Sequence, residues 1–256
     1  MKRILMIAGS VLGFVVLSLG ILIAATFAGR SPIIDGFESG GVRVVRDGIV
    51  TVGIVPIGDR EVALIDAGND REGKAILAEL ARRGLGPEAV KAILLTHGHR
   101  DHVAAAHLFT RAAVMALETE LPLLEGRASG RGPLTRLMPA RPSGVKVARA
   151  LRDGETVRLG DVEIAVYRVP GHSAGSAAFL VKGVLFLGDS ADAASDGRIV
   201  GAPWLFSDSQ ALNRASIAAL AGRLQREGAA VRALVFSHSG ARAEGLGPLA
   251  AFAGRR

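Results

Sequence analysis

Three histidines and one aspartate stand within six residues of this sequence, and such a cluster could hold metal ions. The segment reads Thr96-His97-Gly98-His99-Arg100-Asp101-His102. Imidazole and carboxylate groups are suitable ligands for zinc and similar divalent ions. In an extended turn His97 and His99 can point to one side, and Asp101 and His102, at the start of a helix, can face a second ion. A polar loop with unrelated histidines is the alternative, but the density of ligand-type side chains after an apolar strand disfavours it.

The chain contains no cysteine, so histidine and carboxylate side chains must hold any metal here. His107 fits no ligand spacing, and we interpret it as an ordinary helix-face or surface residue. His172, Asp189 and His238 each stand near the end of an expected strand. Loops at strand ends are where a rigid scaffold usually presents chemistry, so these three are further candidate ligands.

Short apolar strands alternate with helices along the chain, which predicts an α/β fold. Strands are expected at 42–45, 49–55, 62–65, 92–95, 162–169, 178–181, 184–187 and 233–236, and helices at 69–84 and 209–227. Asp47-Gly48 and Lys182-Gly183 are hairpin signals. Residues 117–149 are rich in proline and glycine and predict an irregular excursion, which could act as a partial lid.

The net charge of +7 does not indicate a nucleic-acid-binding protein. Lys2, Arg3 and Arg30 supply part of it, and the remaining basic residues are scattered with little aromatic content between them. A nucleic-acid groove needs clustered positive charge and stacking rings. We therefore expect a small-molecule substrate and no nucleic-acid partner.

The N-terminal segment from residue 4 to 28 is uncharged and mostly apolar. As a helix it would span roughly 37 Å, against a hydrocarbon core of about 30 Å. This length predicts an N-terminal transmembrane helix that anchors an exported catalytic domain in a membrane, facing the periplasm or the extracellular space. The alternative is a secreted protein whose signal peptide is cleaved near Thr26-Phe27-Ala28. Either way we expect residues 1–30 to lie outside a catalytic domain formed by residues 31–256.

The segment Leu94–His102 resembles the signature motif of metallo-β-lactamase-fold hydrolases. Further resemblances follow the family's order over nearly all of residues 37–240. They are Leu64-Ile65-Asp66-Ala67-Gly68, Pro170-Gly171-His172-Ser173-Ala174-Gly175-Ser176, Leu187-Gly188-Asp189 and Ser237-His238-Ser239-Gly240.

This resemblance implies an αββα sandwich with a two-metal site at one edge between the sheets. It implies that His97, His99 and His172 bind the first metal, that Asp101, His102 and His238 bind the second, and that Asp189 bridges both. The ions would be zinc, with iron or manganese as alternatives. Asp66 would be a supporting residue and not a ligand, although a turn-forming aspartate before Gly68 is an equally good interpretation.

The implied activity is hydrolysis. Two ions about 3.5–4 Å apart can share a water and lower its pKa, giving a bridging hydroxide that attacks the substrate. Asp101 could hold or orient this nucleophile. Asp189 resembles the bridging aspartate of glyoxalase II-type thioester hydrolases, lactonases and small-ester hydrolases, which true β-lactamases of this fold generally lack. We therefore expect a small ester, thioester or lactone as substrate.

Two alternatives remain open. One is a phosphodiesterase or nuclease of the same fold, and the other is a non-hydrolytic, iron-binding member. The segment Ala191–Asp208, which contains Pro203, Trp204, Leu205 and Phe206, could line the substrate mouth. Ordinary packing of an aromatic cluster beneath a loop is an equally good interpretation.

Overall fold

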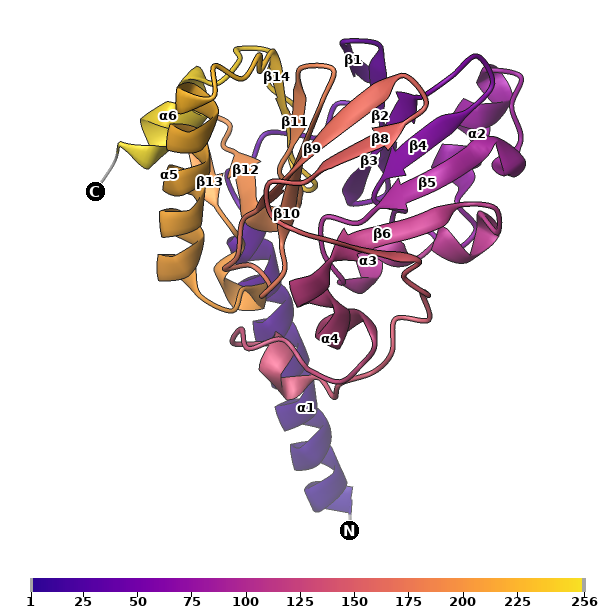
Figure 1. Cartoon of the computed structure of the whole chain (residues 1–256). Helices are drawn as coiled ribbons and strands as arrows, with labels where there is room; N and C mark the ends of the chain where they lie inside the picture. Colours follow the sequence, from indigo (N-terminus) through magenta and orange to yellow (C-terminus); the bar gives the residue numbers. More distant parts are fainter. Residues whose placement is uncertain (1, 255–256) are drawn as a thin grey trace.

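Two β-sheets lie face to face, and helices cover both outer faces (Figure 1). This computed structural model describes the backbone of residues 2–254 and the side chains of residues 12–254. The αββα arrangement confirms the predicted α/β sandwich.

The first sheet follows chain order. Its strands are β1 (Phe37–Ser39), β2 (Val42–Asp47), β3 (Val50–Pro56), β4 (Val62–Ile65), β5 (Val90–Leu94), β6 (Ala113–Leu117) and β7 (Arg149–Leu151). Pairing is antiparallel from β1 to β4 and parallel from β4 to β7. The predicted hairpin joins β2 to β3, where Gly48 takes the positive φ of 65° that the tight turn needs.

The second sheet has the order β14-β11-β10-β9-β8. Its strands are β8 (Thr156–Leu159), β9 (Val162–Arg168), β10 (Ala177–Val181), β11 (Val184–Phe186) and β14 (Ala233–Val235). Pairing is parallel between β11 and β14 and antiparallel elsewhere. The predicted turn Lys182-Gly183 joins β10 to β11, with φ positive at both residues. A separate ribbon pairs β12 (Ala191–Ala193) with β13 (Ile199–Gly201).

The helices are short except for α1 and α5. They are α1 (Lys2–Phe27), α2 (Lys74–Arg82), α3 (Arg100–Val103), α4 (Leu121–Leu124), α5 (Gln210–Arg226) and α6 (Gly247–Ala253). The 3-10 turns are η1 (Pro87–Ala89), η2 (Ala106–Leu108), η3 (Glu118–Glu120), η4 (Thr135–Leu137), η5 (Gly188–Ser190) and η6 (Trp204–Phe206). α5 agrees with the predicted helix, and the side chain of Ser209 caps it by accepting the Leu212 N–H.

The helix predicted from Asn69 or Asp70 begins later than expected. α2 starts at Lys74, because Gly73 before it has a left-handed backbone with φ of 60°. The carboxylate of Asp70 still accepts the N–H groups of Glu72 and Lys74. It therefore satisfies donors at the helix start from outside the cap position.

Burial explains why the strands read as continuous apolar runs. In β4, Ala63 and Ile65 face the core between the sheets, whereas Val62 and Leu64 face the core under the helices. All four β4 residues are buried, since both faces of this strand are covered. The second sheet is covered in the same way by α5 and α6.

The sheet topology brings several chain segments to one edge. β4 and β5 run parallel in one sheet, and β11 and β14 run parallel in the other. The backbone carbonyl of Thr96, just after β5, accepts the N–H of Ala177 at the start of β10 over 2.8 Å. This bond joins the two sheets where the candidate ligands of the sequence begin.

The irregular excursion predicted over residues 117–149 begins later than expected, because η3 and α4 occupy residues 118–124, and it then runs from α4 to β7. Its backbone is tied to the domain at Leu134, which donates to the Leu205 carbonyl of η6 over 2.9 Å, and at Ser143, which donates to Leu124 over 2.8 Å. The excursion therefore lies against η6, although its role as a lid stays a prediction.

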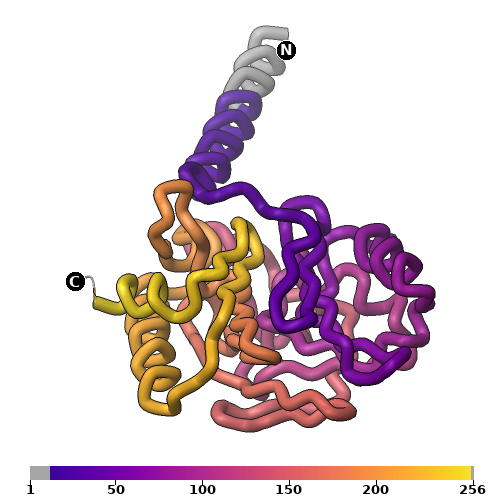
Figure 2. Tube along the Cα trace, turned by 90° about the horizontal axis from the view of Figure 1, so that it is seen from above, coloured from indigo at the N-terminus to yellow at the C-terminus, as the bar shows by residue number. Residues whose placement is uncertain are grey.

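The expectation that residues 4–28 form a transmembrane helix is not supported. Within the part of the chain that the structure describes, no helix is both long enough and apolar enough to cross a bilayer. A span takes about 20 apolar residues, and the described side chains of α1 begin only at Leu12. Residues 4–11 of the expected span lie outside the residues whose side chains are described. The described part of α1 projects from the sandwich (Figure 2), and the division of the chain at residue 30 stays a prediction.

A buried carboxylate fastens α2 to the first sheet. Glu79 pairs with Arg43 of β2 over 3.0 Å, and with Arg82 and Arg83 over 2.8 and 2.7 Å. Burial by itself raises the pKa of Glu79, but the three guanidinium groups outweigh burial and hold its pKa at about 2.

We expect Glu79→Gln to lower the free energy of unfolding by about 2 kcal/mol at neutral pH, because a hydrogen-bonded charge is lost. The pKa of Glu79 is about 2 in the folded chain, below its ordinary value of 4.5. The Glu79 carboxylate therefore stabilises the folded chain fully above pH 4.5, and this contribution is lost as the pH falls towards 2. Urea unfolding of wild type and variant across this window tests the prediction. Glu72→Gln, an exposed control, should match wild type, and identical acid profiles for wild type and Glu79→Gln would contradict the prediction.

Candidate metal centre

All seven predicted ligand side chains meet at this edge of the sandwich, in two adjoining groups. The first group is His97, His99, His172 and Asp189, and the second is Asp101, His102 and His238. In each group, one ligand atom from every member lies within 4.8 Å of the others. His107 lies elsewhere: it is exposed, and its Nδ1 contacts the Ala104 carbonyl.

Three imidazole nitrogens converge in the first group. His97 Nε2, His99 Nδ1 and His172 Nε2 lie 2.9 to 3.2 Å from one another. Such a triangle of nitrogens cannot be satisfied by mutual hydrogen bonds alone, since a neutral imidazole has one N–H. Three converging lone pairs are instead the arrangement that a divalent cation takes.

Asp189 belongs to the first group but also faces the second. Its Oδ2 lies 3.4 Å from His172 Nε2 and 3.1 Å from His238 Nε2, and its Oδ1 lies 3.2 Å from His102 Nε2. Asp101 completes the second group, with its Oδ2 3.5 Å from His238 Nε2 and 3.8 Å from His102 Nε2. A single carboxylate therefore reaches the ligand nitrogens of both groups.

Asp66 and Thr96 orient two of the histidines. The Thr96 hydroxyl donates to Asp66 Oδ2 over 2.7 Å, so it accepts from His97 Nδ1–H over 3.1 Å. His102 Nδ1–H donates to Asp66 Oδ2 over 2.9 Å. With Nδ1 protonated, the lone pair of Nε2 points to the cluster in both rings. Asp66 thus supports two candidate ligands through hydrogen bonds. Its positive φ of 63° also agrees with the alternative interpretation of a turn-forming residue.

Two further histidines are oriented in the same way, by a hydrogen bond from Nδ1–H. Ser207 Oγ donates to the Pro203 carbonyl over 2.7 Å, so it accepts from His172 Nδ1–H over 2.9 Å. His238 Nδ1–H donates to the Ile49 carbonyl over 2.9 Å. Both rings therefore present Nε2 to the cluster, whereas His99 presents Nδ1.

The protonation of the first group suits metal binding. Burial lowers the pKa values of His97, His99 and His172 below the ordinary value for histidine. These rings are therefore neutral at physiological pH, as a metal ligand must be.

Buried polar atoms without hydrogen-bond partners lie between Asp189 and the second group, where a cation could satisfy them. Among the described residues, His102 Nε2 and Asp189 Oδ1 are buried without a hydrogen-bond partner, although they face each other. Burial lowers the pKa of His102, but the carboxylates of Asp189 and Asp66 outweigh burial and raise it well above its ordinary value. Asp189 likewise raises the pKa of His238 to about 9 against the effect of burial. The carboxylates thus attract positive charge here, which a metal ion can supply in place of protons.

Glu120, which was not predicted from the sequence, holds two ligand loops together. Its Oε1 accepts the Gly98 N–H over 2.7 Å, and its Oε2 accepts the Ser173 hydroxyl and the Gly175 N–H over 2.8 Å each. The carboxylate is buried at the end of η3. Nothing in its spacing distinguishes it from the exposed Glu118 two residues earlier, so the sequence carried no signal for this role.

We expect Glu120→Gln to weaken metal binding about 10- to 100-fold, because the amide group places N–H donors against the donors of the ligand loops. Competition between the protein and a zinc chelator measures this affinity, after circular dichroism has shown that the variant is folded. The matched control is Glu118→Gln in the same turn, which should bind zinc like wild type. Equal affinity for Glu120→Gln and wild type would show that the loops are held without this carboxylate.

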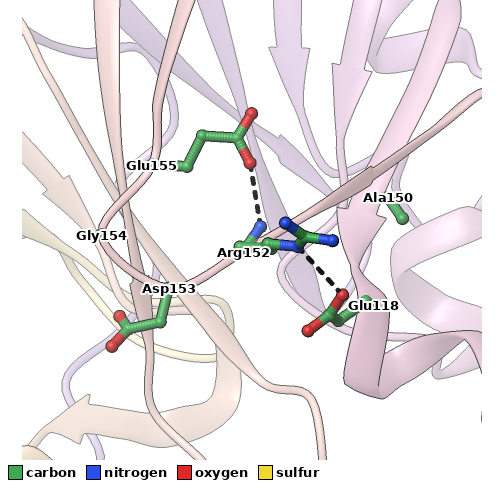
Figure 3. Close-up of a pocket in the computed structure, with 6 residues that line it drawn as sticks. All are labelled: Glu118, Ala150, Arg152, Asp153, Gly154 and Glu155. Atoms are coloured by element: carbon green, nitrogen blue, oxygen red, sulfur yellow. Dashed lines mark hydrogen bonds and ion pairs between the residues drawn. The ribbon is translucent and has the colours of Figure 1, made fainter.

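A surface hollow lies apart from these ligands and does not extend the site. It is lined by Glu118, Ala150, Arg152, Asp153, Gly154 and Glu155 (Figure 3). The charged side chains there already have partners. The Arg152 guanidinium donates to Glu118 over 3.4 Å, and the backbone N–H of Arg152 donates to Glu155 over 2.9 Å. It contains none of the seven candidate ligands.

Comparison with known proteins identifies relatives of the chain. The family model described as the metallo-beta-lactamase superfamily matches residues 45–224. A hydroxyacylglutathione hydrolase of Xanthomonas euvesicatoria pv. vesicatoria (strain 85-10) is 34% identical over 156 residues, covering 60% of this chain and 52% of that protein. One of Pectobacterium carotovorum subsp. carotovorum (strain PC1) is 32% identical over 141 residues, covering 55% and 47%. The chain therefore spans about half the length of these curated relatives.

Solved structures share the fold at lower identity. The metallo-β-lactamase MIM-1 from Novosphingobium pentaromativorans matches with a TM-score of 0.63 and 24% identity, covering 88% of this chain and 87% of that chain. BJP-1, a subclass B3 metallo-β-lactamase of Bradyrhizobium japonicum, matches with a TM-score of 0.62 and 23% identity, covering 88% and 92%. At these identities the likeness concerns the fold alone.

Proposed function

The chain belongs to the metallo-β-lactamase superfamily, and on that premise we propose that it hydrolyses a small ester, thioester or lactone with two divalent metal ions. The proposed ions are zinc, with iron or manganese as alternatives. The proposed ligands are His97, His99 and His172 for the first ion, Asp101, His102 and His238 for the second, and Asp189 for both.

The observation that carries this proposal is the position of Asp189. Its two oxygens lie within 3.4 Å of nitrogens in both ligand groups, and its side chain is 4% exposed. A carboxylate in this position can bridge two cations, and the ligand set then differs from that of the true β-lactamases of this fold. This supports an ester or thioester bond as the one that is cut.

Bound divalent ions would supply an activated water and polarise the carbonyl oxygen of the substrate. The chain's own residues provide the arrangement around that reaction. Asp66, Ser207 and the Ile49 carbonyl fix the rings of three histidines. The Asp101 side chain is 25% exposed, so its carboxylate can accept a hydrogen bond from an attacking water. This bond would orient the water so that the lone pair on the water oxygen points towards the substrate.

The curated relatives support a thioester among the candidate substrates, since their names describe the hydrolysis of hydroxyacylglutathione. The solved β-lactamase structures carry no comparable weight, because their likeness to this chain is below 25% identity. We therefore place a hydroxyacylglutathione thioester first in the panel of substrates to be tested.

We expect the full chain to hold about two equivalents of zinc, to lose hydrolysis on chelation and to regain it on reloading. Asp189→Asn should reduce the zinc content towards one equivalent per chain. It should also lower kcat/KM by about 100-fold, because a group proposed to bind both ions is lost. Elemental analysis and a panel of ester, thioester, lactone, β-lactam and phosphodiester substrates provide the measurements. Asp161→Asn, an exposed control, should behave like wild type.

Other results would reject the proposal in distinguishable ways. Turnover of phosphodiesters without any carboxylic ester would favour the phosphodiesterase alternative. Bound iron with redox activity and no hydrolysis would favour the non-hydrolytic one. Undiminished turnover by Asp101→Ala or Asp189→Asn would show that the proposed ligand set is not the active site.

A further inference from the structure

The last turn of α1 meets the candidate metal centre. The ring of Phe27 lies edge-on to the imidazole of His238, with centroids 5.0 Å apart, and 5.9 Å from the ring of Phe206 in η6. The guanidinium carbon of Arg30 lies 4.5 Å from the centre of the Phe27 ring. An aromatic side chain from the N-terminal segment thus stands beside a ligand of the second group.

A buried ion pair fixes this segment on the domain. Arg30 Nε lies 2.5 Å from Asp192 Oδ2, and the two side chains are 8% and 0% exposed. The other oxygen of Asp192 accepts the hydroxyl of Ser239, the residue after His238, over 2.8 Å. The same carboxylate therefore holds both the N-terminal segment and the loop that carries His238.

Backbone hydrogen bonds reinforce the attachment. Ser31 donates to the Ala193 carbonyl over 2.8 Å, and Ser195 donates to the Gly29 carbonyl over 2.8 Å. Gly240 donates to the Ser31 carbonyl over 3.2 Å. Residues 29–31 thus form an added edge to the ribbon of β12 and β13, and Phe27 has a fixed position just before them.

Phe27 stands beside the second ligand group, in which the Asp101 side chain is 25% exposed. His99 is also partly exposed, whereas the remaining candidate ligand side chains are buried, that of His238 being only 6% exposed. Phe27 packs against the ring of His238. It is only half-buried itself and belongs to none of the three buried cores formed by the described residues. Its ring is therefore available to a molecule that approaches the cluster.

We propose that Phe27 is a specificity-determining residue that, with Phe206, forms an apolar wall beside the second ligand group. The wall packs against an apolar substituent flanking the scissile carbonyl of the substrate. This inference rests on the proposed hydrolysis of esters or thioesters and adds a preference for substrates with an apolar group at that position. Aromatic rings suit this role, since they bury large apolar area with little loss of conformational freedom.

The test compares ester series in which either the acyl group or the alcohol is lengthened from two to six carbons. We expect kcat/KM of the zinc-loaded full chain to rise with length in one series. Phe27→Ala should lower kcat/KM about tenfold for the six-carbon member and less than twofold for the two-carbon member, because only the longer group reaches the wall. Phe27→Leu should restore part of the preference. Phe14→Ala, on the same helix and 72% exposed in the wild type, is the matched control and should leave both series unchanged.

A binding measurement separates this inference from the proposed function. Calorimetric titration of the zinc-loaded chain with acetate and hexanoate, and with ethanol and hexanol, should show tighter binding of the six-carbon molecule in one of the two pairs, a preference that Phe27→Ala removes while zinc content stays the same. If wild type hydrolyses no ester or thioester, the proposed function fails, and the titration alone decides the role of Phe27. Losses of equal size for all chain lengths in both series, or no difference in binding within either pair, would overturn the inference.

Discussion

A buried carboxylate needs positive charge or hydrogen-bond donors beside it, and at the candidate metal centre this constraint applies to Asp189, which is 4% exposed. Burial raises the pKa of Asp189, but His238 and His102 outweigh burial and lower it well below the ordinary value. If a metal ion binds there, these two rings must be neutral to act as ligands, and the ion then compensates the charge of the carboxylate in their place. The candidate centre therefore depends on the charge of Asp189, which either protonated imidazoles or metal ions can compensate.

Several buried polar side chains orient these imidazole rings or the loops that carry them. Asp66 and Ser207 fix histidines through Nδ1, and Glu120 ties the backbone of two ligand loops to each other. Asp192 extends the same principle to the loop of His238 and to the N-terminal segment. All four groups act by accepting hydrogen bonds in buried positions, where a lost partner is costly. The geometry of the candidate ligands thus depends on residues that are not themselves candidate ligands.

Local patterns in the sequence determined the elements that lead to the site. The predicted strand 62–65 agrees residue for residue with β4, and the predicted helix 209–227 agrees with α5 to within one residue at each end. The candidate ligands could also be selected, because histidines and aspartates after apolar strands are a local signal. Short elements such as β12, β13 and α6 gave no such signal, since three to seven residues contain too little periodicity.

Tertiary structure decided what depends on long-range contacts. Arg30 and Asp192 are 162 positions apart and Glu120 lies 55 positions before Gly175, so no local pattern could pair them. The apolar N-terminal run predicted a transmembrane helix that the described structure does not support, whereas its last turn lies against the metal centre. By itself the sequence determined which side chains can bind a metal, because that depends on residue type. Only the folded chain decided which of them share one point in space and which buried groups hold them there, because that depends on how the two sheets meet.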